Sequence, residues 1–273
     1  MQAHSLWTPP TGTLGAVVAE AEVRAEALAA HSDALEEAAG SRPPATSLAA
    51  VLRGPAVTLL TEVKRQSPSK GAIARGLDAV VQAQAYADGG AAGVSILTEP
   101  RHFGGSIDDL RNVVRDVGLP VLKKDFHVHP TQLVEARAEG ASAALLIVRA
   151  VNPDRLAELM SRGQLLGIEL LVEVRDEAEL ELALSLGATM IGVNNRNLET
   201  LVIDPTTAER LIPRIPAAVI AIAESGVGSL ADVERYAAVG ADAVLVGSSL
   251  SAAADPVAAT RALTGVPRIE RAR

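Results

Sequence analysis

The most regular pattern in the chain is a glycine-alanine pair followed by a continuous apolar run. It occurs at residues 89–97, 139–147, 186–193 and 239–247. The interval is roughly 50 residues, about twice the length of one strand-helix unit. Apolar runs without polar alternation predict strands that are buried on both faces. The glycines that introduce the runs fit the left-handed residue at the end of a preceding helix. These glycines are Gly90, Gly140, Gly187 and Gly240.

Further strands are predicted before and between these runs, at residues 57–60, 121–124, 169–174 and 219–223. Helical patterns alternate with the strands, for example at residues 131–139 and 177–186. Eight alternating units within about 220 residues favour a (β/α)8 barrel, the TIM barrel, over a doubly wound open sheet, which shares the same alternation. The strand count and the lack of a composition break in this region indicate a single α/β barrel domain.

A helical extension is predicted before the barrel. Apolar residues recur at helical spacing among charged residues between positions 14 and 39, which indicates one leading helix with an apolar face. Pro43 and Pro44 then separate this helix from the first strand. We therefore expect an N-terminal helical extension at residues 1–45 and a (β/α)8 catalytic barrel at residues 46–273.

Composition and charge exclude several classes of function. The 273 residues carry 33 acidic and 25 basic side chains, a formal net charge of -8, and 2% of them are aromatic. General nucleic-acid binding is disfavoured, because it requires phosphate neutralisation and base stacking. The absence of cysteine excludes disulfides, thiolate nucleophiles and cysteine-ligated zinc. Without a secretory signal pattern or an apolar run of membrane-spanning length, a soluble cytoplasmic protein is expected.

Polar residues follow the predicted strands more often than expected for strand ends that are merely exposed to solvent. In a barrel of this type, the C-terminal ends of the strands form the active-site mouth. The first strand runs into TEVKRQSPSKG, where the two-residue period places Glu62 and Lys64 on one face and Val63 on the other. Other strands end in LKKDF, LLVEV, IGVNNRN and AIAESG. A salt-bridged strand end before an ordinary turn would explain one such cluster, but not this number of them.

The ends of the last two strands, ESGVGS and VGSS, combine hydroxyl groups with glycine backbone. Barrels of this type often bind phosphate at these two loops, although plain turn chemistry has the same composition. The stretch GVGSLA matches a dinucleotide fingerprint, but the acidic residue that should follow is missing. His127 and His129 could chelate a metal, but they have no clear third ligand, so a polar loop is expected there.

Nine sequence blocks resemble, in order and spacing, the signature of the indole-3-glycerol phosphate synthase family. They are TEVKRQSPSKG, SILTE, HFGGS, VLKKDF, ALLIV, LLVEV, IGVNNRNLETL, AESGV and VLVGSSL, and they run from about Leu59 to Leu250. The leading helix is similar to the extra N-terminal segment of this family. The resemblance implies a carboxy-lyase of tryptophan biosynthesis. Such an enzyme converts 1-(2-carboxyphenylamino)-1-deoxyribulose 5-phosphate to indole-3-glycerol phosphate, carbon dioxide and water.

The resemblance also implies which residues form the site. The catalytic lysines of the family match Lys64 and Lys124. Its other polar active-site residues match Glu62, Glu173, Asn194 and Glu224. The positions around the substrate phosphate match Ser67, Ser225, Gly226, Gly247 and Ser248. The wall near the anthranilate ring and the arginine after the asparagine match Leu97, Phe103 and Arg196.

The adjacent lysines of LKKDF receive different roles. Periodicity alone does not say which of Lys123 and Lys124 faces the barrel mouth, and the resemblance decides for Lys124. Lys124 is expected to be the acid in ring closure, with a pKa lowered by like-charged neighbours. Glu173 is expected to be the base, and Lys64 to bind the substrate carboxylate and act as a second acid. Lys123 is then expected to lean towards the helices or solvent, and its loss is expected to have the small effect of losing a surface lysine.

Two residues depart from the family pattern, and several alternatives stay open. Asn197 replaces the usual aspartate and Thr61 the common alanine; the loop around Asn197 is expected to be held differently.

The resemblance implies no cofactor and no metal. The protein is expected to be a monomer whose partner is a small phosphorylated substrate, not nucleic acid or a membrane. The alternatives are a phosphoribosylanthranilate isomerase, which normally requires a cysteine, a Schiff-base aldolase using Lys124, and a barrel kept only as a binding partner.

Overall fold

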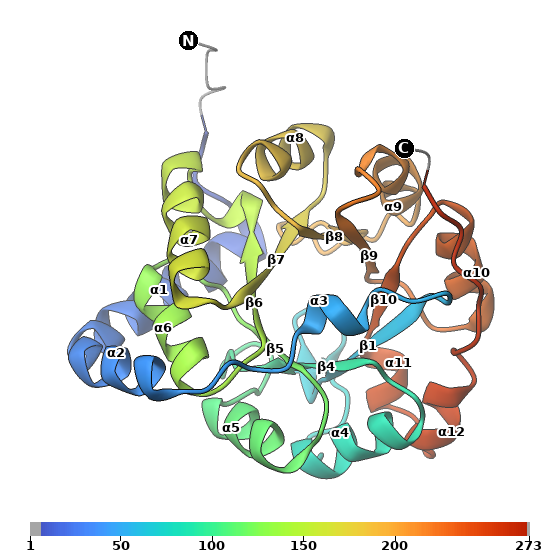
Figure 1. The fold of residues 1–273 in the computed structure, drawn as a ribbon, viewed down its shortest axis with the longest axis horizontal. Coiled ribbons are helices and arrows are strands. Elements are labelled where there is room, and N and C mark those ends of the chain that lie inside the picture. Colours follow the sequence, from blue (N-terminus) through green and yellow to red (C-terminus); the bar gives the residue numbers. More distant parts are fainter. Residues whose placement is uncertain (1–6, 272–273) are drawn as a thin grey trace.

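Eight parallel strands form a closed barrel, which is seen end-on in Figure 1. The structure is a computed structural model that describes residues 7–271. Neighbouring strands pair in the order β1-β10-β9-β8-β7-β6-β5-β4, and β1 also pairs with β4 to close the barrel. The barrel strands are β1 (Thr58–Val63), β4 (Gly93–Leu97), β5 (Val121–Lys124), β6 (Ala143–Ile147), β7 (Glu169–Val174), β8 (Met190–Asn194), β9 (Ile220–Glu224) and β10 (Ala243–Val246). The predicted fold class is confirmed.

The apolar runs form strands because both of their faces are covered. Every residue of β4, β6, β8, β9 and β10 is buried. The four glycines that introduce these runs have φ angles of 95°, 85°, 82° and 90°. A side chain is strained at such angles, so glycine is favoured where the chain leaves a helix and turns into the next strand. This confirms the interpretation of the glycine-alanine pattern.

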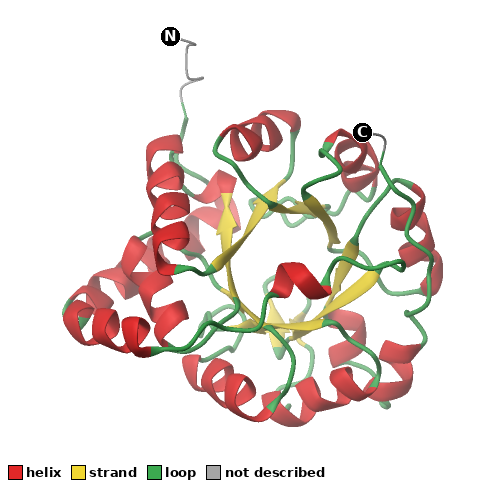
Figure 2. Ribbon diagram, in the orientation of Figure 1, coloured by secondary structure: helices red, strands yellow, loops and turns green. Residues whose placement is uncertain are grey.

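Helices surround the barrel as a ring, coloured red in Figure 2. They are α4 (Ala79–Asp88), α5 (Ile107–Asp116), α6 (Pro130–Ala138), α7 (Pro153–Leu166), α8 (Glu177–Ser185), α9 (Thr206–Leu211), α10 (Leu230–Ala238), α11 (Ser248–Ser251) and α12 (Pro256–Arg261), with short 3-10 turns η1 (Val148–Ala150) and η2 (Ile212–Arg214). A small antiparallel pair, β2 (Gln66–Ser67) and β3 (Gly71–Ala72), lies in the loop after β1. Within residues 7–271, every helix is too short or too polar to cross a membrane.

The prediction of one leading helix was wrong, because the segment forms two helices, α1 (Gly12–Ala29) and α2 (Ser32–Ser41). The chain turns at His31, whose φ and ψ of -117° and 15° leave the helical region. The apolar side of α1 packs into the main core, whereas α2 buries Ala39 against Val134 and Ala138 of α6. Figure 1 shows both helices beside α6. Because the two apolar sets contact different surfaces, a straight helix could not bury both.

A short helix, α3 (Leu48–Val51), closes the end of the barrel opposite the site. It crosses the barrel opening in the view of Figure 1. The backbone N–H of Ala49 donates to the Glu169 carboxylate at the start of β7 over 2.8 Å, and Leu48 is fully buried against Gly93 at the start of β4. The predicted boundary at residue 45 falls between α2 and α3 and stays a prediction. Residues 1–6 and 272–273 of the predicted parts lie outside the described residues.

Candidate active site

A cavity of about 310 Å³ opens at the C-terminal ends of the barrel strands. All fourteen site residues that the sequence predicted line it, and the eight strands contribute in turn from Glu62 on β1 to Ser248 after β10. The apolar wall also contains residues that the sequence reasoning missed. They include Leu14 and Val17 of α1, Phe126 after β5, Leu145 and Ile147 of β6, and Leu198, Leu201 and Ile203 after β8. The structure therefore brings the predicted residues together, while their individual roles stay predictions.

Lys124 lies at the centre of a cluster of carboxylates. Its Nζ is 2.6 Å from Glu224 Oε2 on β9 and 3.5 Å from Glu173 Oε2 on β7. Burial alone would lower the pKa of Lys124, but the charges of Glu224, Glu173 and Glu62 outweigh it and raise the pKa above its usual range. The expectation that like charges lower this pKa was wrong, because the neighbours across the mouth are glutamates. Lys124 is therefore held as an ammonium.

The pKa of Glu224 is raised as well, which for a carboxyl group favours the neutral form. Burial raises its pKa to about 7, Glu173 adds repulsion, and the ammonium of Lys124 opposes the shift. Its Oε2 bonds Lys124, while its Oε1 is buried without a hydrogen-bond partner among the described residues. This carboxyl group therefore takes up a proton more readily than an exposed glutamate does. It can therefore exchange a proton within the cluster.

A second pair of opposite charges lies on β1. Glu62 and Lys64 form a salt bridge and face the cavity, while Val63 between them packs in the hydrophobic core. This confirms the predicted alternation. Burial would raise the pKa of Glu62, but the cations of Lys64 and Lys124 hold it below its usual value. Glu62 is therefore a buried anion shared by both lysines, and it places the Lys64 ammonium at the cavity wall.

Asn194 orients the carboxylate of Glu173. Its Nδ2 donates to Glu173 Oε1 over 2.8 Å, and its Oδ1 accepts from the backbone N–H of Arg196 over 2.9 Å. The guanidinium of Arg196 donates to the carbonyl of Leu201 at 2.8 Å, and burial lowers its pKa. Arg196 thus fixes the loop after β8, in which Leu201 has a φ of 65°. The general-base candidate and this loop share one hydrogen-bonded support.

Neither departure from the family pattern disturbs the site. Asn197 Oδ1 accepts the backbone N–H groups of Glu199 and Thr200 at 2.8 and 3.1 Å. A carboxylate oxygen would accept the same two donors, so the asparagine holds the loop as an aspartate could. The buried hydroxyl of Thr61 donates to the carbonyl of Gly93 over 3.2 Å and does not face the cavity.

The serine and glycine positions gather on one side of the cavity, where β9 and β10 end. Ser225 and Gly226 have φ angles of 66° and 84°, which turn the loop after β9 sharply. Gly247 is glycine for a different reason, because a Cβ there would lie 2.7 Å from Glu62 Oε1. Ser67, from the loop after β1, the strand that pairs with β10, also lines the cavity. The arrangement offers hydroxyls and closely approachable backbone to an anion.

The polar residues behind Lys124 face away from the cavity. Lys123 is 1% exposed and forms a salt bridge with Glu135 on α6, so it leans towards the helices, and the expectation that it behaves as a surface lysine was wrong. The reason is that α6 covers this face of β5.

The two histidines after β5 have structural contacts. His127 Nδ1 donates to the carbonyl of Leu145 over 2.6 Å, and burial lowers the pKa of this imidazole to about 3. His129 accepts the backbone N–H of Thr131 and caps α6.

Glu179 on α8 lies near Glu173 and makes the free energy of unfolding depend on pH. Burial raises its pKa to about 7, and the charges of Asp176 and Glu173 add to the shift. The native state therefore keeps a proton that the unfolded chain releases above a pH of 4.5. This stabilisation is complete below that pH and disappears as the pH rises through about 7.

We expect Glu179→Gln to reduce the difference in the free energy of unfolding between pH 5 and pH 8 by about 2 kcal/mol. Denaturant unfolding at pH 5 and pH 8 measures the effect. Glu181→Gln, at an exposed position on the same helix, is the control and should keep the wild-type profile. An unchanged profile in Glu179→Gln would show that this carboxyl group titrates normally.

Comparisons with known proteins agree with this geometry. The model of the indole-3-glycerol phosphate synthase family matches residues 16–263. The indole-3-glycerol phosphate synthase of Mycolicibacterium smegmatis is 48% identical over 236 residues, which cover 86% of this chain and 87% of that protein. The one of Streptomyces griseus is 50% identical over 227 residues, which cover 83% and 84% of the two chains.

Solved structures with lower identity share the barrel. The crystal structure of 3-hexulose-6-phosphate synthase from Salmonella typhimurium matches with a TM-score of 0.61 and 18% sequence identity, over 76% of this chain and 96% of that one. At this identity the likeness supports the fold alone. The family match extends over the barrel and most of α1. The chain therefore belongs to the indole-3-glycerol phosphate synthase family.

Proposed function

We propose that this chain carries out the reaction for which its relatives are named, with Lys124 as the acid of ring closure and Glu173 as the base. The observation that carries the assignment is the position of the Lys124 ammonium, 2.6 and 3.5 Å from two glutamates, in a cavity that also holds a serine-glycine wall and an aromatic wall. The substrate carries a phosphate and an aromatic carboxylate. The cavity supplies local cations for both, despite the net charge of -8.

Ring closure joins the carboxylate-bearing aryl carbon to the ketone carbon of the substrate. The electron pair of the ketone moves to its oxygen, and Lys124 donates a proton there. The carboxylate then leaves as carbon dioxide, and the electrons of the broken bond restore the aromatic ring. A raised pKa suits this role, because Lys124 keeps its proton until the more basic alkoxide forms.

Dehydration completes the reaction at the same carbon. The new hydroxyl group leaves as water with a proton from Lys64, while Glu173 takes the proton from the neighbouring carbon. Glu62 holds the Lys64 ammonium at the cavity wall, where this ammonium can first bind the substrate carboxylate. Asn194 keeps Glu173 in place through its 2.8 Å hydrogen bond. Glu224, with a pKa of about 7, can return a proton to Lys124 between the steps.

The anthranilate ring is assigned to the apolar side of the cavity. Phe103 and Phe126 lie with their ring centroids 6.1 Å apart and line the cavity together with Leu97. Flat apolar side chains of this kind favour an aromatic ligand. Phe126 follows Lys124 by two residues, so the acid and one of the two rings of the aromatic wall belong to one short segment.

A Schiff-base role for Lys124 is disfavoured, because imine formation requires a neutral amine and the surrounding glutamates raise its pKa. The expected cytoplasmic location, the monomeric state and the absence of a metal or cofactor requirement stay predictions. The test of the function is incubation of the purified chain with the carboxyphenylamino substrate, with product formation followed by indole fluorescence. No signal from folded protein at saturating substrate would contradict the assignment.

The phosphate assignment is tested best at Ser248. The substitution Gly247→Asp would be ambiguous, because its Cβ would collide with Glu62. Ser248 is half-buried and lines the cavity, so Ser248→Asp places a carboxylate beside the proposed phosphate. We expect the affinity for inorganic phosphate and for substrate to fall by at least about tenfold through charge repulsion. Calorimetric titration measures this, and Ser185→Asp, an exposed position on α8, adds the same charge away from the cavity. Unchanged phosphate affinity would place the phosphate elsewhere.

A further inference from the structure

Helix α1 covers part of the cavity and is attached to the loops around it. Thr13, Leu14 and Val17 line the cavity, and Leu14 and Val17 are buried there. At its N-terminal end, the backbone N–H of Thr11 donates to Glu199 of the loop after β8 over 2.7 Å. In the C-terminal half of α1, Arg24 contacts Glu99 in the loop after β4 and Asp125 directly after β5. The helix thus bridges loops that face the substrate from two sides.

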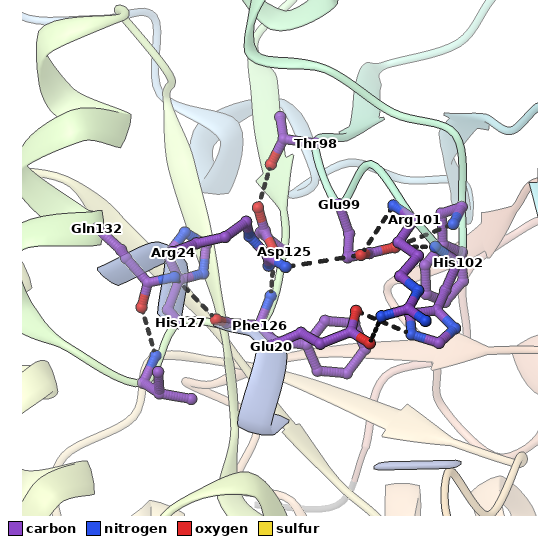
Figure 3. A network of polar contacts seen from close by, with 12 residues as sticks. Glu20, Arg24, Thr98, Glu99, Arg101, His102, Asp125, Phe126, His127 and Gln132 are labelled. Carbon is purple, nitrogen blue, oxygen red and sulfur yellow. Dashed lines mark hydrogen bonds and ion pairs between the residues drawn. The ribbon is translucent and has the colours of Figure 1, made fainter. Parts of the chain in front are cut away.

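Arg24 makes the central contact of α1 with β4 and β5, as Figure 3 shows. One terminal nitrogen lies 2.7 Å from Asp125 Oδ1. The other lies 3.6 Å from Glu99 Oε1. The side chain is 27% exposed, whereas both carboxylates are almost completely buried. One guanidinium therefore neutralises two buried anions, one after each strand, and a compact ammonium lacks this forked geometry.

Asp125 follows Lys124 directly and is held on every side. Its Oδ2 accepts the Thr98 hydroxyl over 2.6 Å, and its Oδ1 accepts the backbone N–H of Phe126 at 2.8 Å as well as Arg24. Burial would raise the pKa of Asp125, but the charges of Lys123 and Arg24 keep it below its usual value. The carboxylate is therefore an anion that fixes the backbone on the C-terminal side of the catalytic lysine.

Glu99 organises the loop that carries Phe103. Its Oε1 accepts the backbone N–H of Arg101 over 3.0 Å. Its Oε2 accepts the N–H groups of His102 and Phe103 at 2.6 and 3.0 Å. With its oxygens occupied by three amides and close to Arg24, Glu99 holds the loop in one conformation. Since Phe103 faces Phe126 in the cavity, this loop and the segment after β5 together form the aromatic wall.

A second contact fastens the same loop to α1. Glu20, one helical turn before Arg24, lies 2.7 Å from Arg101 and 3.1 Å from the His102 ring (Figure 3). Glu20, Glu99 and His102 come close enough together to suggest a cation site. However, both carboxylates already face arginines, and Glu99 also accepts backbone N–H groups. The cluster is therefore better explained as a fastening between α1 and the loop after β4.

We propose that Arg24 is a positioning residue for the reaction: by bridging Asp125 and Glu99, it sets the catalytic lysine and the aromatic wall in register with each other. The proposal rests on the roles assigned above to Lys124 and Phe103. Arg24 does not line the cavity. Arg24 is expected to affect kcat only by holding Lys124 and Phe103 in place. A small displacement of an acid relative to its substrate costs about 10²-fold in rate.

The test compares two arginines that anchor the N-terminal helices. Arg24→Met removes the bridge, whereas Arg42→Met removes the hydrogen bond between the end of α2 and the Ala138 carbonyl, far from the cavity. We expect kcat to fall by about 10–10²-fold in Arg24→Met, with unchanged affinity for inorganic phosphate. Arg42→Met should keep kcat within about twofold of wild type, as expected for a contact away from the reacting atoms. Arg24→Lys, which keeps the charge and loses the fork, should lie between wild type and Arg24→Met.

Two further readouts separate positioning from general loosening. In a double-mutant cycle, Arg24→Met combined with Asp125→Asn should lower kcat little more than either change alone, because both break one bridge. Hydrogen exchange at the His102 and Phe103 amides should become faster in Arg24→Met. This readout needs no activity, so it still tests the bridge if the wild-type chain proves inactive and the proposed function fails.

Full kcat in Arg24→Met with lowered stability would overturn the proposal and leave Arg24 a structural residue. Equal losses of kcat in Arg24→Met and Arg42→Met would also overturn it, since the effect would then belong to the extension as a whole. If Arg24→Met does not fold, Arg24→Lys carries the same comparison with Arg42→Lys. Wild-type kcat in Arg24→Lys would then count against the need for a fork.

Discussion

Replacing Lys124 by methionine should lower kcat by about 10²–10⁴-fold while substrate binding stays measurable. Methionine keeps a side chain of similar length but has no proton to donate. The phosphate loops after β9 and β10 are left intact, so affinity for inorganic phosphate should not change. Single-turnover fluorescence measures the chemical step, and calorimetry with phosphate measures the intact part of the site.

Lys123→Met is the matched control, because it alters the neighbouring lysine on the opposite face of β5. Lys123 is paired with Glu135 under α6, so its loss leaves a carboxylate that is only 17% exposed without its cation. We expect the free energy of unfolding to fall by about 2–3 kcal/mol, since breaking one partner of a buried pair is costly. The kcat of the folded protein should stay near wild type. The reverse pattern, with Lys123→Met inactive and Lys124→Met active, would show that the acid is Lys123.

The barrel and the composition of its mouth could be predicted because both follow from local rules. Buried parallel strands appear as continuous apolar runs, and the two-residue period assigns Glu62 and Lys64 to one face. The pKa of Lys124 could not be predicted in this way. Its partners, Glu173 and Glu224, lie on β7 and β9, which do not pair with β5. Their approach depends on how the side chains converge across the closed barrel.

The same limit explains the errors at the N-terminus and at Lys123. The apolar spacing continues through His31 without a proline or glycine, so no local signal marks the turn between α1 and α2. The turn follows from the surfaces that the two helices cover. Lys123 was expected to face the helices or solvent because successive strand residues face opposite ways and Lys124 was assigned to the cavity. Glu135 of α6 supplies its partner, and that contact is a property of the tertiary packing.

The active site requires a residue without a side chain at position 192, where the chain has glycine. It shares the inward face of β8 with Asn194, two residues away. A Cβ at this position would lie 2.0 Å from Glu224 Oε1 and 3.0 Å from its Cδ. The carboxyl group of Glu224 therefore occupies the space where a side chain of β8 would project. Sequence reasoning treated this glycine as part of an apolar strand.

Gly192→Ala should lower kcat by about 10²-fold, because the methyl group must displace Glu224 from its 2.6 Å contact with Lys124. Gly118→Ala is the control, since a Cβ there meets no atom within 4 Å, and it should keep full activity. In the double variant Gly192→Ala with Glu224→Ala, the shortened side chain makes room for the methyl group. Its kcat should therefore match that of Glu224→Ala alone. A folded Gly192→Ala with wild-type kcat would contradict the requirement, because Glu224 could then move without cost and its contact with Lys124 would not matter for turnover.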